Sequence, residues 1–174
     1  MKCDGCRNPV PHFLGIGAPR AGTTWLHVML SKHPNIYMPP IKEVHYFDSI
    51  DPSIDEVFHI DQISYRWKRL FFNRLKHYAG HVFGHLSLSL RERAKPDWPW
   101  DSAFFAPGSS VDWYKNLFEK ATPHGNLPGE ITPAYIMLSE NIIRLIREKV
   151  GVHKIILLLR NPIDATYSCV EKQG

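Results

Sequence analysis

A segment near the N-terminus has the layout of a phosphate-binding loop. Gly17 and Gly22 enclose four residues, after an apolar run that predicts a strand (12–17) and before an amphipathic run that predicts a helix (23–32). Such a loop lets backbone N–H groups converge on an anion, and the N-terminus of the helix adds partial positive charge. The residues expected to hold that anion are Arg20, Ala21, Gly22, Thr23 and Thr24.

This loop lacks the lysine that serves the β- and γ-phosphates in ATPases and kinases. Thr23 stands at the lysine position, and Arg20, the only cation of the loop, lies before the second glycine. Since no strand ends in a clear aspartate for Mg²⁺ either, a nucleotide kinase or another P-loop phosphotransferase is the weaker alternative. A tight turn whose glycines serve packing alone is the alternative without a ligand.

A second candidate site is the charged segment at residues 41–48, with the sequence IKEVHYFD. We expect this segment to be extended, which would place Glu43 and His45 on one face. A carboxylate beside an imidazole could take a proton from a hydroxyl. The alternative without chemistry is a surface ion pair between Lys42 and Glu43.

A third candidate site follows a strongly apolar run. Residues 154–159 predict a strand buried on both faces of a parallel sheet, and Arg160 stands at its carboxyl end, where α/β folds bind ligands. Pro162 suits the first turn of the next helix, which carries Ser168 nearly two turns later. Arg160 and Ser168 could therefore hold one anion, and the alternative is an arginine that merely faces solvent.

The elements that must position these residues alternate between strands and helices. Further patterns predict a strand at 36–38, helices at 62–78, 111–120 and 139–150, and a loop at 97–108. Ser139 is the expected N-cap of the last of these helices, and Gly151 its end. The alternation predicts an α/β, P-loop-like fold of three layers, in which helices flank a central parallel sheet.

Composition sets broader limits. The 174 residues suit one domain, which we place at 12–174 behind a flexible tail at 1–11. A formal net charge of +4 suits the handling of small anions and does not by itself imply nucleic acid. With no apolar run near the ~20 residues of a membrane span and no signal-peptide core, we predict a cytoplasmic protein. Cys3 and Cys6 form a lone CxxC, expected to be reduced and unrelated to function.

Taken together, these motifs resemble those of sulfotransferases that use 3′-phosphoadenosine 5′-phosphosulfate (PAPS). Residues 19–26 (PRAGTTWL) resemble their 5′-phosphosulfate loop, where most members have lysine at the position of Arg20. Residues 41–48 resemble the Lys-Glu-x-x-(Tyr/Phe)-Phe segment of heparan-sulfate-type and bacterial carbohydrate sulfotransferases. Residues 129–135 (GEITPAY) resemble a further family segment, with Ile131 in place of the usual lysine. Because members usually continue well beyond Ser168, the resemblance implies a domain that is incomplete at its C-terminus.

The resemblance implies a role for each matching residue. The implied catalytic residues are Glu43 as base, Arg20 and His45. The implied donor-binding residues are Arg20, Ala21, Gly22, Thr23 and Thr24 for the 5′-phosphosulfate, and Arg160 and Ser168 for the 3′-phosphate. Lys42 and Asp48 are assigned to the acceptor side. Trp25 is expected in the core or against the nucleotide, and Glu130 is expected to be structural rather than to contact the acceptor.

The sequence thus predicts an enzyme that transfers a sulfuryl group from PAPS to a hydroxyl of a carbohydrate or small alcohol. Its partners would be PAPS or its desulfated product and this acceptor, with no metal and no nucleic acid. A domain that binds the nucleotide without turnover is the main alternative.

Overall fold

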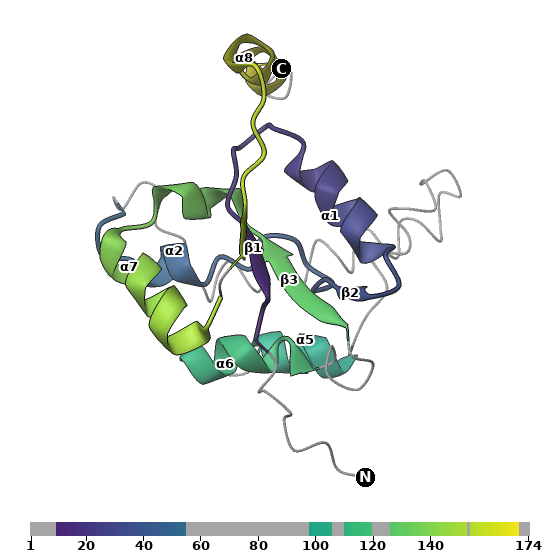
Figure 1. Ribbon diagram of the computed structural model, residues 1–174, viewed down its shortest axis with the longest axis vertical. Coiled ribbons are helices and arrows are strands. Elements are labelled where there is room, and N and C mark those ends of the chain that lie inside the picture. Colours follow the sequence, from purple (N-terminus) through teal and green to yellow (C-terminus); the bar gives the residue numbers. More distant parts are fainter. Residues whose placement is uncertain (1–9, 55–97, 106–109, 120–125, 153, 171–174) are drawn as a thin grey trace.

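The computed structural model describes residues 10–54, 98–105, 110–119, 126–152 and 154–170. Within them, four strands form one parallel sheet in the order β2-β3-β1-β4 (Figure 1). The strands are β1 (Phe13–Gly15), β2 (Ile36–Tyr37), β3 (Leu127–Ile131) and β4 (Lys154–Ile156). The parallel sheet with flanking helices confirms the predicted α/β fold class.

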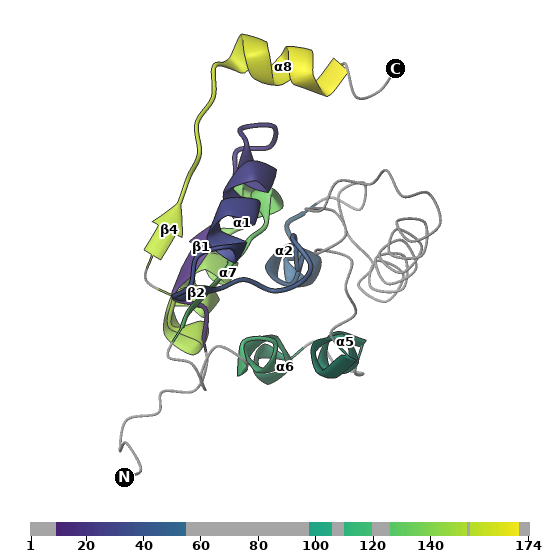
Figure 2. The ribbon, with the colours of Figure 1, turned by 90° about the vertical axis from the view of Figure 1, so that its right-hand side faces the viewer.

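The helices cover both faces of this sheet. They are α1 (Thr23–Ser31), α2 (Phe47–Ile50), α5 (Trp98–Phe105), α6 (Val111–Asn116), the 3₁₀ helix η2 (Pro133–Met137), α7 (Glu140–Leu145), the π-helical turn η3 (Ile146–Val150) and α8 (Pro162–Val170). Figure 2 shows α8 apart from the other layers, at the end of an extended segment that follows β4.

Alternation along β1 separates two cores. Leu14 points to the larger one, which is built mainly from aromatic side chains of α2, α5 and α6 and aliphatic side chains of α7 and η3. Phe13 points to the opposite face, where it packs with Met38 and Ile131 and where Leu26 of α1 also lies. The sheet is therefore the middle of three layers.

Two glycines fix the register between β1 and β3. Phe13 pairs with Gly129, and Gly15 pairs with Ile131. A Cβ on Gly129 would overlap the ring of Phe13, and a Cβ on Gly15 would lie 2.7 Å from Cγ1 of Ile131. The large side chain of each pair thus lies over the glycine of the other strand, so a shift of register would create a clash.

The prediction of a loop at residues 97–108 is wrong for most of these residues, because α5 occupies Trp98–Phe105. Trp100 and Phe104, one helical turn apart, stack with ring centroids 4.8 Å apart, and both are buried. The indole N–H of Trp100 donates to the carbonyl of Leu117 (3.0 Å), and that of Trp113 donates to the carbonyl of Ala103 (2.8 Å). The two indole hydrogen bonds and the ring stacking stabilise a helix whose sequence has little apolar periodicity.

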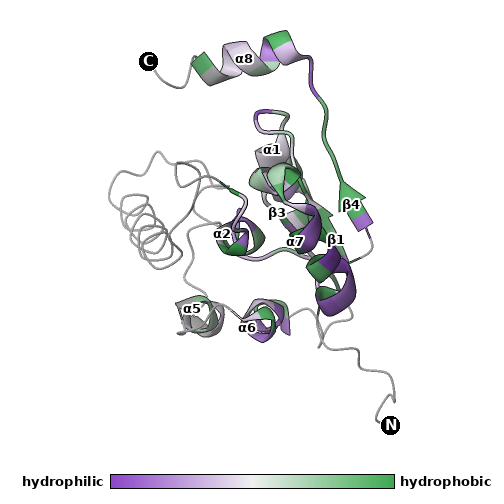
Figure 3. Ribbon diagram, turned by 90° about the vertical axis from the view of Figure 1, so that its left-hand side faces the viewer, coloured by the Kyte–Doolittle hydropathy of each residue, from purple (hydrophilic) through white to green (hydrophobic). Residues whose placement is uncertain are grey.

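The prediction that residues 154–159 form a strand buried on both faces is also wrong. β4 ends at Ile156, and among the described residues it pairs only with β1. Ile155 is 54% exposed and Leu159 80% exposed, and Figure 3 shows that the chain stays apolar from β4 into the following segment. An edge position leaves side chains uncovered that a central strand would bury.

The C-terminal helical prediction is largely confirmed. α7 and η3 together span residues 140–150, and Gly151 ends them in the left-handed conformation at φ 85°. Ser139 occupies the N-cap position, but its hydroxyl caps no amide; its own N–H instead donates to Oδ2 of Asp51 (2.7 Å). The helix predicted at 62–78, residues 1–9 of the predicted tail, and Cys3 and Cys6 lie outside the described residues, so those predictions stay predictions.

Candidate functional site

Three segments of the site meet at the carboxyl edge of the sheet. β1 leads directly into the glycine loop, and β4 leads through an extended segment to Arg160. At the end of β3, the carbonyl of Ile131 accepts the N–H of Glu43 (3.1 Å). Because all strands are parallel, these ends lie on one side of the sheet, where open α/β folds bind ligands.

The glycine loop has an unusual backbone. Gly17, Arg20 and Gly22 have φ values of 132°, 64° and 92°, all in the region that favours glycine. At Gly17 the backbone also passes close to η2, since a Cβ there would lie 3.1 Å from the carbonyl of Pro133. For Arg20 this conformation costs about 1–3 kcal/mol, a cost often found where a binding loop must hold one shape.

The loop leaves the N-terminus of α1 open to an anion. Gly22, which has no side chain to cap the helix, is the N-cap, and the first turn carries no acidic residue. The first amides of any helix have no acceptor within the helix and carry partial positive charge. Thr23 is buried and Thr24 is exposed, so their two hydroxyls do not face the same surroundings. The backbone amides are therefore the groups at this end of α1 that could bind an anion together.

Arg20 contributes a cation beside these amides. Its Nε is buried and, within the described residues, has no hydrogen-bond partner. Buried polar groups nearly always have a partner, so an unpaired guanidinium N–H in a loop of this shape fits an anionic ligand.

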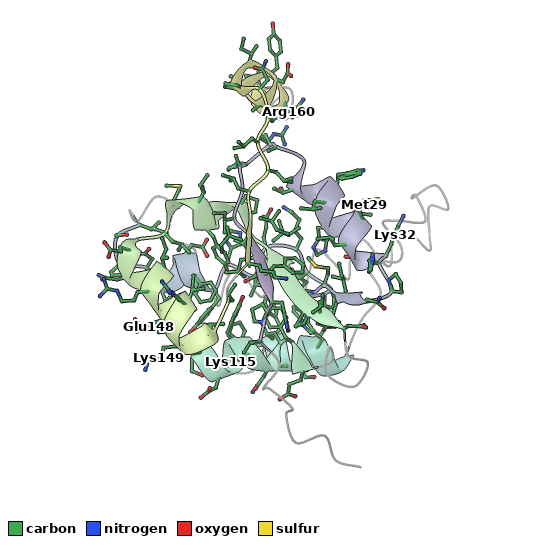
Figure 4. All side chains as sticks on the ribbon, in the orientation of Figure 1. Met29, Lys32, Lys115, Glu148, Lys149 and Arg160 are labelled. Atoms are coloured by element: carbon green, nitrogen blue, oxygen red, sulfur yellow. The ribbon has the colours of Figure 1, made fainter. Side chains whose placement is uncertain are left out.

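Arg160 is brought to the same loop. The amide of Leu158 donates to the carbonyl of Gly17, and the amide of Ala18 donates to the carbonyl of Leu158, both at 2.8 Å. Nη1 of Arg160 then donates to the backbone carbonyl of Arg20 (3.2 Å), and Figure 4 shows the side chain beside the loop. The structure thus brings Arg20 and Arg160, which were predicted to belong to two separate phosphate sites, together at one loop.

Trp25 and Ser168 are the two other residues predicted to bind the donor. Trp25 is 67% exposed on α1, so its expected position in the core is wrong; the first turn of the helix turns this side chain outward. Ser168 lies in α8 and, within the described residues, makes no side-chain hydrogen bond with Arg160 or with the loop. The side chain of Arg160 hydrogen-bonds to the loop.

The charged segment gathers its four predicted residues into one cluster. Lys42 pairs with Glu43, Oε2 of Glu43 lies 3.6 Å from Nε2 of His45, and Nδ1 of His45 lies 2.5 Å from Oδ2 of Asp48. The predicted extended backbone is wrong: Glu43 and His45 are left-handed at φ 66° and 55°, and α2 begins at Phe47. The contact between the two side chains thus comes from two left-handed residues and not from strand alternation.

These contacts set the charges of the cluster. Burial alone would raise the pKa of Glu43, but hydrogen bonds from His45 and Lys42, with their positive charges, lower this pKa to about 2. Burial alone would lower the pKa of His45, but hydrogen bonds to Asp48 and Glu43, with their charges, raise it to about 9. At neutral pH, Glu43 is therefore ionised and His45 is protonated between two carboxylates.

Glu130 lies fully buried behind this cluster. Its carboxylate accepts hydrogen bonds from Tyr114 (2.5 Å), Tyr135 (3.0 Å), Thr132 (3.0 Å) and the amide of Val44 (3.4 Å). Burial raises the pKa of Glu130, while these four hydrogen bonds act in the opposite direction. The structural role expected for Glu130 agrees with these contacts.

The partners of Glu130 include residues that the sequence analysis missed. Tyr135 belongs to the segment that resembles the family pattern, but no role was expected for its hydroxyl. Tyr114 comes from α6, and its spacing from Glu130 gives no signal in the sequence. Burial, together with the charge of Glu130, keeps the pKa of both phenols well above the usual value, so they remain donors.

Within the described part of the chain, no helix is both long enough and apolar enough to cross a membrane. In the same part, no three His, Cys, Asp or Glu side chains are grouped as metal ligands would be. The cytoplasmic location stays a prediction.

Sequence similarity to known proteins points to one family. The chain is 27% identical over 161 residues to the membrane-associated sulfotransferase kil1 of Dictyostelium discoideum; the match covers 91% of this chain and 22% of that protein. The chain thus spans about a fifth of the length of this relative. No solved structure matches significantly. The model of the Sulfotransferase family matches residues 11–172. Because this match covers nearly the whole chain, the protein belongs to the sulfotransferase family.

Proposed function

We propose that this chain transfers a sulfuryl group from PAPS to a hydroxyl of an acceptor. The observation that supports this most is the meeting of the Arg20 loop and Arg160 at the sheet edge that also receives Glu43. Family membership supports the transfer reaction, and the pair of arginines suits a donor with two separate phosphate groups.

On the donor side, the amides from Gly22 onward and the guanidinium of Arg20 would bind the 5′-phosphosulfate. Arg160 would bind the 3′-phosphate, since its planar fork can make two parallel hydrogen bonds to one phosphate. The exposed Trp25 is proposed to contact the nucleotide, and Ser168 to assist Arg160 from α8. These groups hold the donor and neutralise the charge that builds up on the leaving bisphosphate.

On the acceptor side, Glu43 is proposed as the base. It is ionised at neutral pH, whereas His45 is protonated and has no free lone pair to accept a proton. The acceptor oxygen would attack sulfur as the bond between sulfur and the phosphate oxygen breaks, and the hydroxyl proton would pass to Glu43. His45, held by Asp48, would orient the carboxylate, and Lys42 would place positive charge beside it.

This assignment leaves Glu43 with low basicity in the resting cluster. A carboxylate whose pKa is about 2 is a weak base, because Lys42 and His45 stabilise its charge. If Lys42 turned toward the oxygens of the transferring group, that stabilisation would weaken and the basicity of Glu43 would rise.

The acceptor is proposed to be a carbohydrate or a small alcohol.

Ligand binding separates this proposal from a nucleotide kinase. In a thermal-shift titration, adenosine 3′,5′-bisphosphate at about 100 times its dissociation constant should stabilise the chain by about 2.7 kcal/mol. ATP with Mg²⁺ at the same concentration should give a much smaller shift, because the loop has no lysine after its second glycine. A larger shift with ATP and Mg²⁺ would favour the kinase, and no shift with either would contradict the proposed donor site. Binding without sulfate transfer would favour a nucleotide-binding domain that lacks turnover.

A further inference from the structure

The backbone of the Glu43–His45 turn is tied to one short stretch of the chain. The amide of Glu43 donates to the carbonyl of Ile131 (3.1 Å), the amide of Val44 to Oε2 of Glu130 (3.4 Å), and the amide of Tyr46 to the hydroxyl of Tyr135 (3.1 Å). All three acceptors belong to β3 and to η2, which follows it. The turn is therefore held from one side by main-chain and side-chain acceptors.

Such support is needed because the turn is strained. Glu43 and His45 both have left-handed backbones, a conformation that side-chain-bearing residues keep only where the surroundings over-determine it. Relaxation of either residue would redirect its side chain and separate the carboxylate from the imidazole. The hydrogen bonds that the amides of Glu43, Val44 and Tyr46 donate oppose that relaxation.

The chain of bonds from the turn to Glu130 has one consistent direction. Tyr135 accepts the amide proton of Tyr46 and donates its own hydroxyl proton to Oε1 of Glu130 (3.0 Å). Oε1 also accepts from Tyr114, and Oε2 accepts from Thr132 and Val44. A carboxylate can accept at all four places, whereas an amide at this position would bring its NH₂ against one of the four donors.

We infer that Glu130, acting through Tyr135, is a positioning residue that holds the Glu43–His45 turn in its left-handed form. The inference rests on the proposed function in one respect: that function makes Glu43 the catalytic base, whose position then matters. It goes beyond that function because it gives a role to Glu130, a buried residue that the proposed transfer reaction does not use and that is hydrogen-bonded to the Val44 amide and to Tyr135.

Tyr114 provides a matched control for Tyr135. Both phenols are buried, both donate to Oε1 of Glu130, and both rings pack against Phe47. Only Tyr135 also accepts an amide of the turn. Tyr135→Phe and Tyr114→Phe therefore each remove one hydroxyl that donates to Oε1 of Glu130. Tyr135→Phe also removes the acceptor of the Tyr46 amide.

The test follows the His45 imidazole by NMR as a function of pH, with His45→Asn used to assign its signal. Glu43 and Asp48 are the carboxylates that face this ring, and they hold its pKa at about 9. Tyr135→Phe and Glu130→Gln should lower this pKa by about one unit or more, because the carboxylate of Glu43 is no longer held beside the ring. Tyr114→Phe should leave it within about 0.3 of the parent value. Thermal unfolding shows which variants are folded.

A pKa that stays near 9 in folded Tyr135→Phe, or one that falls equally in Tyr114→Phe, would overturn the inference. Amide hydrogen exchange on the unmodified chain keeps the test decisive if variants do not fold. Val44 and Tyr46 should then be protected about as well as β3, and rapid exchange at Tyr46 would also overturn it. None of these readouts uses a substrate. They therefore stand apart from the proposed function, which fails if Glu43→Gln retains full sulfate transfer.

Discussion

The guanidinium of Arg160 donates a hydrogen bond to the backbone carbonyl of Arg20, 140 positions earlier in the sequence. This contact depends on the parallel pairing of β1 and β4, which brings the segments after both strands to the same edge of the sheet. The two cations of the proposed donor site are thus positioned by the sheet, and the Arg160 side chain is already directed at the loop.

Loss of the Arg160 charge should weaken donor-product binding. In Arg160→Gln, the affinity for adenosine 3′,5′-bisphosphate should fall about tenfold to a hundredfold, because a charge-assisted hydrogen bond contributes about 1.5–3 kcal/mol. Isothermal titration calorimetry measures this change. Arg144→Gln is the control, since Arg144 is exposed on α7 and pairs only with Glu140 among the described residues. Equal losses in both variants would show a general charge effect instead of a binding site.

Substitutions of Arg20 should depend on charge. Arg20→Met keeps an unbranched stem but removes the guanidinium, and it should weaken bisphosphate binding by about tenfold or more. Arg20→Lys should recover most of the affinity, because an ammonium can still meet a phosphate although it lacks the planar fork. The same calorimetric titration tests both. If the Arg20→Met and Arg20→Lys variants bound the bisphosphate equally well, the charge of Arg20 would not contribute to bisphosphate binding.

The stability of the chain should fall on the alkaline side. The pKa of His45 is raised from 6.5 to about 9, so its stabilising contribution is complete below pH 6.5 and is lost as the pH rises through about 9. The pKa of Glu43 is lowered from 4.5 to about 2, so its contribution is complete above pH 4.5 and is lost as the pH falls through about 2. Both contributions are complete between these two unfolded-state values.

Urea unfolding checks this window. Between about pH 6 and about pH 9, His45 should account for a loss of roughly 3 kcal/mol in the free energy of unfolding. In His45→Asn this alkaline decline should disappear. The variant should also be less stable overall, because Asp48 is then buried without the imidazole that pairs with it. An unchanged decline in His45→Asn would assign the effect to other groups.

Asp51 should stabilise the start of α7. It is 1% exposed and accepts the amides of Ser139 (2.7 Å) and Ser53 (3.0 Å) and the hydroxyl of Ser53 (2.7 Å). Asp51→Asn should lower the free energy of unfolding by about 1–3 kcal/mol, since hydrogen bonds to a charged acceptor are lost. Asp164→Asn, at an exposed position of α8, should cost less than about 0.5 kcal/mol. Similar losses in urea unfolding would contradict this role.

Much of the fold could be predicted because its signals are local. The apolar run before Gly17, the glycine spacing and the amphipathic run after Gly22 identify a strand, a loop and a helix without reference to the rest of the chain. Arg160 could be placed at the sheet edge because a parallel strand and a proline-started helix surround it. The fold class follows from the same alternation.

The missed features depend on contacts that are distant in sequence. Two indole hydrogen bonds stabilise α5, from Trp100 to Leu117 and from Trp113 to Ala103, and neither appears as a helical period of α5. The left-handed backbones of Glu43 and His45 go against local preference and are supported by acceptors on β3 and η2. The prediction for the segment around Glu43 therefore had the wrong backbone, although the structure does bring its charged residues together.

The central claim is that Glu43 removes the acceptor proton during sulfate transfer. Transfer of ³⁵S from labelled PAPS to a panel of sugars and simple alcohols tests it, with Glu43→Gln compared to the parent chain and to Glu140→Gln, an exposed acid on α7. We predict that Glu43→Gln lowers turnover by about a hundredfold or more while its affinity for the bisphosphate stays within about twofold, and that Glu140→Gln matches the parent. Full turnover in Glu43→Gln, or no transfer by the parent chain to any acceptor, would contradict the claim.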